Sequence, residues 1–151
     1  MKKVLVFGGS GFLGSHVSDI LTDRGYSVTI FDKNKSSFLS DKHKFIQGDS
    51  LSIDHVDKAI KKQDIVYNFS GISEIDEVKK NPIEGVKQNI LANTIILEGC
   101  RKFKIKRFIF GSSIYYLGQK GAELFPSEGS DRISYGLEFP SGQLLDETEN
   151  I

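Results

Sequence analysis

Three glycines separate two segments of opposite character near the start of the chain. Residues 4–7 are all apolar and predict a buried parallel strand, and an amphipathic segment begins at Phe12. Gly8 permits a tight reversal, Gly11 lets a diphosphate approach the backbone, and Gly14 lets the following helix pack close to the strand. The N–H groups at the start of that helix would face the anion. This order of strand, turn and helix predicts a diphosphate site and disfavours the alternative, an ordinary glycine-rich turn.

An acidic residue ends the second predicted strand, which covers residues 27–31. In a dinucleotide site, a carboxylate at the place of Asp32 accepts hydrogen bonds from the adenosine ribose hydroxyls. Asp32 therefore favours NAD over NADP, because a 2′-phosphate would meet a like charge. Lys33 and Lys35 weaken this preference, since a neighbouring basic residue can tolerate the phosphate, and Lys33 joins Asp32 among the expected cofactor-binding residues. The alternative is that Asp32 only begins a turn.

Strand and helix patterns alternate along most of the chain. The helix that begins at Phe12 closes at Arg24 and Gly25, and Ser52 is the expected N-cap of a second helix. The remaining strands are predicted over 44–47, 65–69 and 107–110. Five strands alternating with helices predict a doubly wound parallel sheet, the three-layer α/β Rossmann fold, with strand order 3-2-1-4-5.

The longest predicted element is a helix over residues 82–103. Asn81 is a suitable N-cap for this helix, and Pro82 is favourable at its first position. Glu84 lies three residues after the cap, where an acidic residue completes a capping box. Apolar residues at helical spacing keep to one side of it, namely Ile83, Val86, Ile90, Leu97 and Cys100. As the only cysteine, Cys100 excludes an internal disulfide, and its place on this side predicts packing rather than reactivity.

Composition narrows the classes of function. The 151 residues suffice for one domain of ordinary size. The numbers of basic and acidic residues are equal, 20 of each, so the net charge does not predict binding to nucleic acid or to a membrane surface. No apolar run approaches the ~20 residues of a membrane span, and the apolar stretch after Lys3 is too short for a signal sequence. We expect a cytoplasmic protein.

Taken together, these stretches resemble the extended short-chain dehydrogenase/reductase family, the NAD-dependent epimerase/dehydratases that act on nucleotide sugars. The resemblance extends to about residue 136 and rests on Asp32, Gly48-Asp49 and these motifs: GGSGFLG (8–14), NFSG (68–71), NPIEGVKQN (81–89), RFIFGSSIYYLG (107–118) and SYG (134–136). It implies an NAD-binding Rossmann core over 1–118. Residues 119–151 then correspond to a loop and a degraded catalytic helix, with a helix expected only within 134–149.

The resemblance also implies contacts around the cofactor. Phe12 and Leu13 would lie beside the pyrophosphate, and Asp49 and Ser50 beside the adenine. Further on, Phe69, Ser70 and Gly71 would line the path toward the nicotinamide ribose. Asn89 matches a helix asparagine near the active site.

Two residues match the catalytic pair of the family. Ser113 corresponds to the serine or threonine that hydrogen-bonds the reacting oxygen, and Tyr135 to the acid/base tyrosine. The alternatives are a polar strand end for Ser113 and an exposed loop aromatic for Tyr135. The family lysine four residues after the tyrosine is Phe139 here, and Pro140 follows it. An unassisted tyrosine, with a pKa of about 10, is a poor base at neutral pH.

Two functions remain open at this point. The first is the NAD-binding domain of a nucleotide-sugar epimerase/dehydratase, in which Tyr135 takes a proton from a sugar hydroxyl while hydride passes to the nicotinamide. The second is a catalytically inactive, truncated NAD-binding module, because the chain lacks both the lysine and a carboxy-terminal substrate domain. Members of the family often dimerise through the long helix and the tyrosine-bearing helix, and the resemblance leaves a homodimer open.

Overall fold

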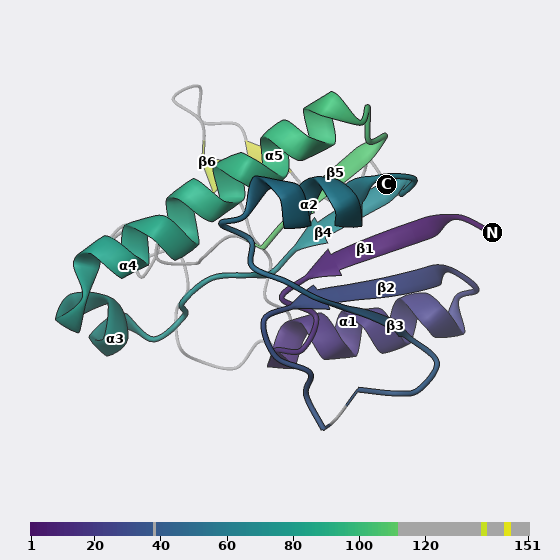
Figure 1. The fold of residues 1–151 in the computed structure, drawn as a ribbon, viewed down its shortest axis with the longest axis horizontal. Helices are drawn as coiled ribbons and strands as arrows, with labels where there is room; N and C mark the ends of the chain where they lie inside the picture. The colour runs from purple at the N-terminus through teal and green to yellow at the C-terminus, as the bar shows by residue number, and fades with distance from the viewer. Residues whose placement is uncertain (38, 112–136, 139–143, 146–151) are drawn as a thin grey trace. The chain divides into compact units, whose positions relative to one another are not determined.

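Five short runs rich in Val, Ile and Phe form a parallel sheet (Figure 1). The computed structural model describes residues 1–37 and 39–111, and further along only two short strands. The sheet order is β3-β2-β1-β4-β5, as predicted. Its strands are β1 (Lys3–Phe7), β2 (Ser27–Asp32), β3 (Lys44–Gln47), β4 (Ile65–Asn68) and β5 (Arg107–Phe110). Because β1 lies between β2 and β4, the connections diverge beside its carboxyl end, where open α/β sheets bind ligands.

Helices cover both faces of this sheet. α1 lies on one face, and α2 and α5 lie on the other (Figure 1). The helical segments are α1 (Phe12–Asp23), α2 (Ile53–Ile60), α3 (Ile75–Lys80), α4 (Pro82–Val86), the π-helix η1 (Lys87–Leu91) and α5 (Ala92–Lys102). In the described ranges, no helix combines the length and the apolar character that crossing a membrane requires.

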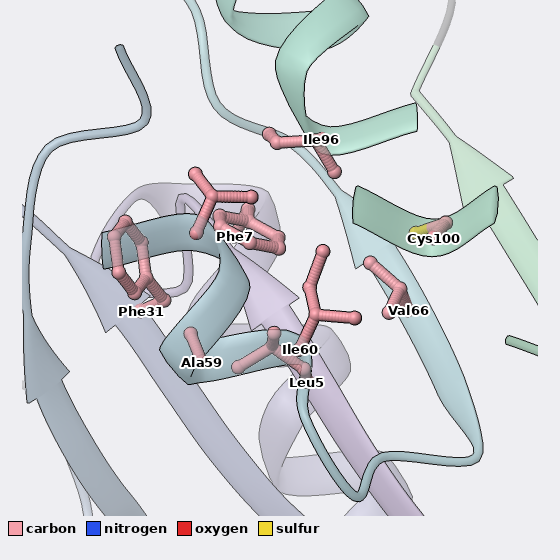
Figure 2. Close-up of a cluster of buried hydrophobic side chains, with 9 residues drawn as sticks. Leu5, Phe7, Phe31, Ala59, Ile60, Val66, Ile96 and Cys100 are labelled. Atoms are coloured by element: carbon pink, nitrogen blue, oxygen red, sulfur yellow. The ribbon is translucent and has the colours of Figure 1, made fainter. Parts of the chain in front are cut away.

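The core divides into two layers because successive residues of a strand point to opposite faces. Val4 and Val6 of β1 pack on the side of α1, whereas Leu5 and Phe7 pack on the other. Figure 2 shows the second layer, in which the strand residues meet α2 and α5 through Leu5, Phe7, Phe31, Val66, Ala59, Ile60, Ile96 and Cys100. This packing fixes β1 and β2 against α2 and α5, and both strands end at the site described below.

The long helix differs from its prediction in two ways. It is continuous over α4, η1 and α5, but η1 is a π-helix, which carries one extra residue per turn. Its buried residues are Gly85, Ala92, Ile96, Gly99 and Cys100. Of the apolar side predicted from spacing, only Cys100 is buried, and the other four residues are exposed by 43–70% of their surface: Ile83, Val86, Ile90 and Leu97. The prediction from apolar spacing did not include the small residues Gly85, Ala92 and Gly99, which are buried.

The start of this helix follows its sequence signals in part. The side chain of Asn81 caps the helix by accepting the N–H of Glu84, and Pro82 occupies the first position. The carboxylate of Glu84 instead accepts the amide of Gln88 at 2.6 Å. The short helix α3 just before it was not predicted from the sequence.

The second unit, Ser113–Ile151, is described only at two strands. β6 (Leu137–Glu138) and β7 (Leu144–Leu145) pair in an antiparallel arrangement, with Leu137 opposite Leu145. The expected helix within 134–149 is therefore wrong at these four residues. A proline and a glycine lie between the two strands, and both residue types disfavour a helix interior.

Candidate functional site

A hollow of 360 Å³ opens at the carboxyl ends of the strands. The glycine turn after β1, the end of β2 and the loop after β4 contribute to its wall, and so do side chains from α3, α4 and η1. The lining residues are Gly8, Gly11, Phe31, Asp32, Lys33, Ser50, Phe69, Ser70, Gly71, Ile72, Glu77, Glu84 and Gln88. The structure thus brings together residues that the sequence placed on four separate segments.

The glycines of the turn after β1 serve different purposes. Gly8 has a φ of 71°, and a Cβ there would lie 2.7 Å from the backbone of Phe69 and Ser70. A Cβ at Gly14 would collide with the carbonyl oxygen of Gly8. Among the residues that the structure describes, a Cβ at Gly11 would meet only that same oxygen, at 3.3 Å. Gly8 and Gly14 are therefore required by the fold, whereas Gly11 keeps a surface open to a ligand.

The start of α1 is available to an anion. Its N-cap is Gly11, which has no side chain to cap the helix, and no acidic residue lies in the first turn. The first N–H groups of an α-helix have no carbonyl partner within the helix, and they lie at the positive end of its dipole. The side chains of Phe12 and Leu13 are 85% and 53% exposed at this end. This arrangement is typical of a phosphate site.

The carboxylate of Asp32 is fixed by two backbone groups. One oxygen accepts the N–H of Ser10 at 3.0 Å, and the other accepts the N–H of Asn34 at 3.3 Å. The first bond ties the end of β2 to the glycine turn. Asp32 lines the main hollow and also a smaller one of 300 Å³, to which Lys35 contributes. The carboxylate retains acceptor capacity for a further donor.

The basic residue next to Asp32 has a partner. The ammonium of Lys33 lies 3.6 Å from a carboxylate oxygen of Asp49. Asp49 is itself held, because its other contacts are the N–H of Leu51 at 3.0 Å and a backbone bond to the ring of His55 at 3.2 Å. Ser50 is buried beside this pair and lines the hollow. Lys33 is therefore partly neutralised, and the wall near Ser50 is ordered by short-range contacts.

Amide side chains hold the loop after β4. Asn89, within η1, accepts the N–H of Ile72 at 2.7 Å and donates to its carbonyl oxygen at 3.1 Å. Asn68 is fully buried at the end of β4 and contacts both Ser70 and Asn93. Sequence reasoning placed Asn89 near the site but assigned no role to Asn93. No local pattern marks it, because its partner lies on a strand 25 residues earlier.

The expected catalytic residues cannot be compared with this geometry. Ser113, Tyr135 and Phe139 lie outside the residues that the structure describes. Their assignment remains a prediction from the sequence.

The fold and the site together define a class of protein. A doubly wound parallel sheet with a glycine turn after β1 and a carboxylate at the end of β2 is the dinucleotide-binding Rossmann arrangement. A scan against family models matches residues 4–136 to the NAD dependent epimerase/dehydratase family. The chain belongs to that family, which confirms the resemblance derived from its motifs.

Similar proteins bear out the match. UDP-glucose 4-epimerase uge1 of Schizosaccharomyces pombe is 32% identical over 127 residues, which cover 76% of this chain and 36% of that protein. Among solved structures, the UDP-glucose 4-epimerase of Thermotoga maritima with UDP-glucose has a TM-score of 0.71 at 28% identity, covering 74% of this chain and 38% of that one. The Thermus thermophilus UDP-glucose 4-epimerase complex with NAD has a TM-score of 0.70 at 26% identity, with 74% and 37% coverage. The chain thus spans little more than a third of the length of these relatives.

Proposed function

We propose that this chain binds NAD in the hollow at the carboxyl edge of its sheet. One observation carries the proposal: the open Gly11 surface, the uncapped start of α1 and the Asp32 carboxylate all border that hollow. Its volume of 360 Å³ falls within the ~300–1,000 Å³ of small-molecule sites. The family match and the NAD complex of the Thermus thermophilus enzyme support the same assignment.

Each part of the dinucleotide has a suitable counterpart. The pyrophosphate would lie against the start of α1, beside Phe12 and Leu13, and the adenosine ribose hydroxyls would donate to Asp32. The adenine would lie on the side of Asp49 and Ser50. This placement favours NAD over NADP, because a 2′-phosphate would approach Asp32 while the ammonium of the adjacent residue, Lys33, is paired with Asp49.

The other end of the hollow would receive the nicotinamide half. Phe69, Ser70 and Gly71 form its wall there, and Asn89 holds the following residue, Ile72. NAD, when bound, supplies a hydride acceptor for the oxidation of a substrate hydroxyl. In the longer relatives named above the substrates are nucleotide sugars, so we propose the same substrate class for the protein to which this domain belongs.

A catalytically inactive NAD-binding module is the second candidate. A specific residue favours it: Phe139 stands four positions after Tyr135, where a cation would lower the pKa of the tyrosine. Hydride transfer assayed with a panel of nucleotide sugars separates the two candidates. Turnover by the unmodified chain supports the enzyme. No turnover, with activity gained on Phe139→Lys, supports the inactive module.

Isothermal titration with NAD tests the binding proposal. Gly11→Ala should fold, since the new Cβ meets only one oxygen at 3.3 Å, yet it should weaken NAD binding at least tenfold because the methyl group occupies the phosphate approach. Gly25→Ala is the matched control: Gly25 follows the same helix at its far end with a φ of 83°, so its substitution strains the backbone away from the hollow. Absence of heat with both NAD and NADP in the unmodified chain would refute the proposal.

We also propose that the chain forms a homodimer through the long helix. Five large apolar side chains of α4, η1 and α5 are exposed, namely Ile83, Val86, Ile90, Leu91 and Leu97. An apolar stripe of this kind is favourable to bury against a second copy. The resemblance to a family that often dimerises through this helix supports the same choice.

A further inference from the structure

A chain of three hydrogen-bonded side chains runs from the long helix to the wall of the hollow. The amide nitrogen of Asn68 donates to the amide oxygen of Asn93 at 2.9 Å. The amide oxygen of Asn68 accepts both the backbone N–H of Ser70 at 3.0 Å and the Ser70 hydroxyl at 2.6 Å. Asn68 is fully buried, and Ser70 lines the hollow.

The direction of every bond in this chain follows from one backbone group. The N–H of Ser70 only donates, so the side-chain atom of Asn68 that faces it must be the oxygen. The nitrogen of Asn68 must then face Asn93, which presents its own oxygen. The Ser70 hydroxyl faces this same oxygen, which can only accept, so its single proton must be donated to Asn68. What remains on Ser70 is acceptor capacity alone.

The loop is also fixed beyond Ser70. Asn89 binds both backbone groups of Ile72, so the segment from Ser70 to Ile72 is held at its two ends from one helix. Asn89 lies within the π-helix η1, and Asn93 lies one turn further on in α5. The position of the Ser70 oxygen is therefore determined by side chains that do not themselves border the hollow.

We infer that Asn93 is a positioning residue that acts through Asn68 to present Ser70 as a hydrogen-bond acceptor, which selects a ribose hydroxyl of the ligand and not a phosphate oxygen. A ribose hydroxyl can donate to Ser70, whereas an ionised phosphate offers acceptors only. The inference rests on the proposed NAD function and adds to it: the nicotinamide-side ribose is recognised at Ser70, opposite the ribose recognised at Asp32.

The test compares NAD, ADP-ribose and ADP by isothermal titration. ADP lacks the second ribose, and ADP-ribose has this ribose without the nicotinamide. Ser70→Ala and Asn93→Leu should each weaken the binding of NAD and of ADP-ribose about three- to tenfold, as expected for one neutral hydrogen bond. The affinity for ADP should stay unchanged. Because both variants break the same chain, the double variant should bind NAD no more weakly than Ser70→Ala alone.

Two further variants separate positioning from general stability. Asn93→Asp keeps an acceptor for the Asn68 amide, so the ratio of NAD to ADP affinity should stay at its original value even where the added charge weakens both. Thr94→Val changes the neighbouring residue of α5, whose hydroxyl donates to the carbonyl oxygen of Ile90, and it should change the affinity for neither NAD nor ADP.

The outcomes are distinct for the two claims. Equal losses of affinity for NAD and for ADP in the folded Ser70→Ala or Asn93→Leu variants would overturn the positioning role. So would a loss of NAD affinity in the double variant that equals the product of the losses in the two single variants. Unchanged NAD affinity in Ser70→Ala would overturn the contact itself, even if Asn93→Leu failed to fold. Failure of the unmodified chain to bind any of the three ligands would instead overturn the proposed NAD function.

Discussion

Replacing Asp32 by Asn changes the charge at the end of β2 with almost no change in size. The carboxylate of Asp32 accepts the N–H groups of Ser10 and Asn34, one on each oxygen. An amide has only one oxygen, so Asn can keep the shorter bond to Ser10 and must turn its NH₂ group toward Asn34. The glycine turn therefore stays tied to β2, and we expect the variant to fold.

The effect on NAD affinity follows from the kind of hydrogen bond that is lost. Bonds to a charged group contribute about 1.5–3 kcal/mol, against about 0.5–1.5 kcal/mol between neutral groups. Losing the charge under two ribose hydroxyls should therefore weaken NAD binding about ten- to hundredfold. For NADP the change has the opposite sign, since two like charges about 4 Å apart repel by about 1 kcal/mol in water and about 4 kcal/mol near a protein surface. Selectivity for NAD over NADP should fall by about two orders of magnitude or more.

Isothermal titration of both dinucleotides into Asp32→Asn measures this selectivity directly. The control is Asp41→Asn, which makes the same change in net charge at an exposed residue that does not line the hollow. Unchanged selectivity in an Asp32→Asn variant with an unaltered thermal midpoint would refute the ribose contact. A similar loss in Asp41→Asn would show that net charge, and not the contact, controls affinity.

Three other predictions address the fold and the assembly. Gly14→Ala should destabilise the protein by about 3 kcal/mol in urea unfolding, because its Cβ collides with the Gly8 carbonyl, and a loss under about 1 kcal/mol would contradict the close packing of the turn. Burial raises the pKa of the Cys100 thiol to about 11, so a chromogenic disulfide should label it at pH 8 only after unfolding. The stability that the neutral, buried thiol of Cys100 contributes should be complete below the unfolded pKa of about 9 and should decline as the pH rises to 11, since only the unfolded thiol ionises in that range. Prompt labelling of the native protein at pH 8 would contradict the burial of this thiol. Ile90→Asp should convert a sedimenting dimer into a monomer while Lys87→Asp on the same helix should not, and an unmodified chain that sediments as a monomer would disprove the proposed dimer.

Strands and their order were accessible from the sequence because they depend on local signals. Apolar runs bounded by glycine or charged residues identify buried parallel strands, and the connection rules then leave few arrangements for five of them. The glycine turn and Asp32 were equally readable, since each function follows from the residue type and its place after a strand. Ser52 at the start of α2 shows the same locality: its hydroxyl accepts the N–H of His55 three residues later.

The long helix shows where local reading fails. Spacing identified an apolar side, yet the buried positions include Gly85, Ala92 and Gly99, and the two glycines lie close to side chains of α3 and α2. A Cβ at Gly99 would lie 2.8 Å from a methyl group of Ile60. Such contacts depend on a distant neighbour and leave no periodic hydrophobic signal. The same holds for the pairing of Asn68 with Asn93, which only the assembled sheet brings together.

The π-helical segment fixes the rotational phase between the two halves of the long helix. One residue of an α-helix advances the chain by about 100° around the axis. If the same five residues Lys87–Leu91 were wound as a regular α-helix, the extra residue that the π turn absorbs would turn everything after it by about that angle relative to everything before. Either Ile96 and Cys100 would leave the core, or Gly85 would leave its place against Val78. The irregular turn is therefore what allows one continuous helix to serve both the loop after β4 and the core of the sheet.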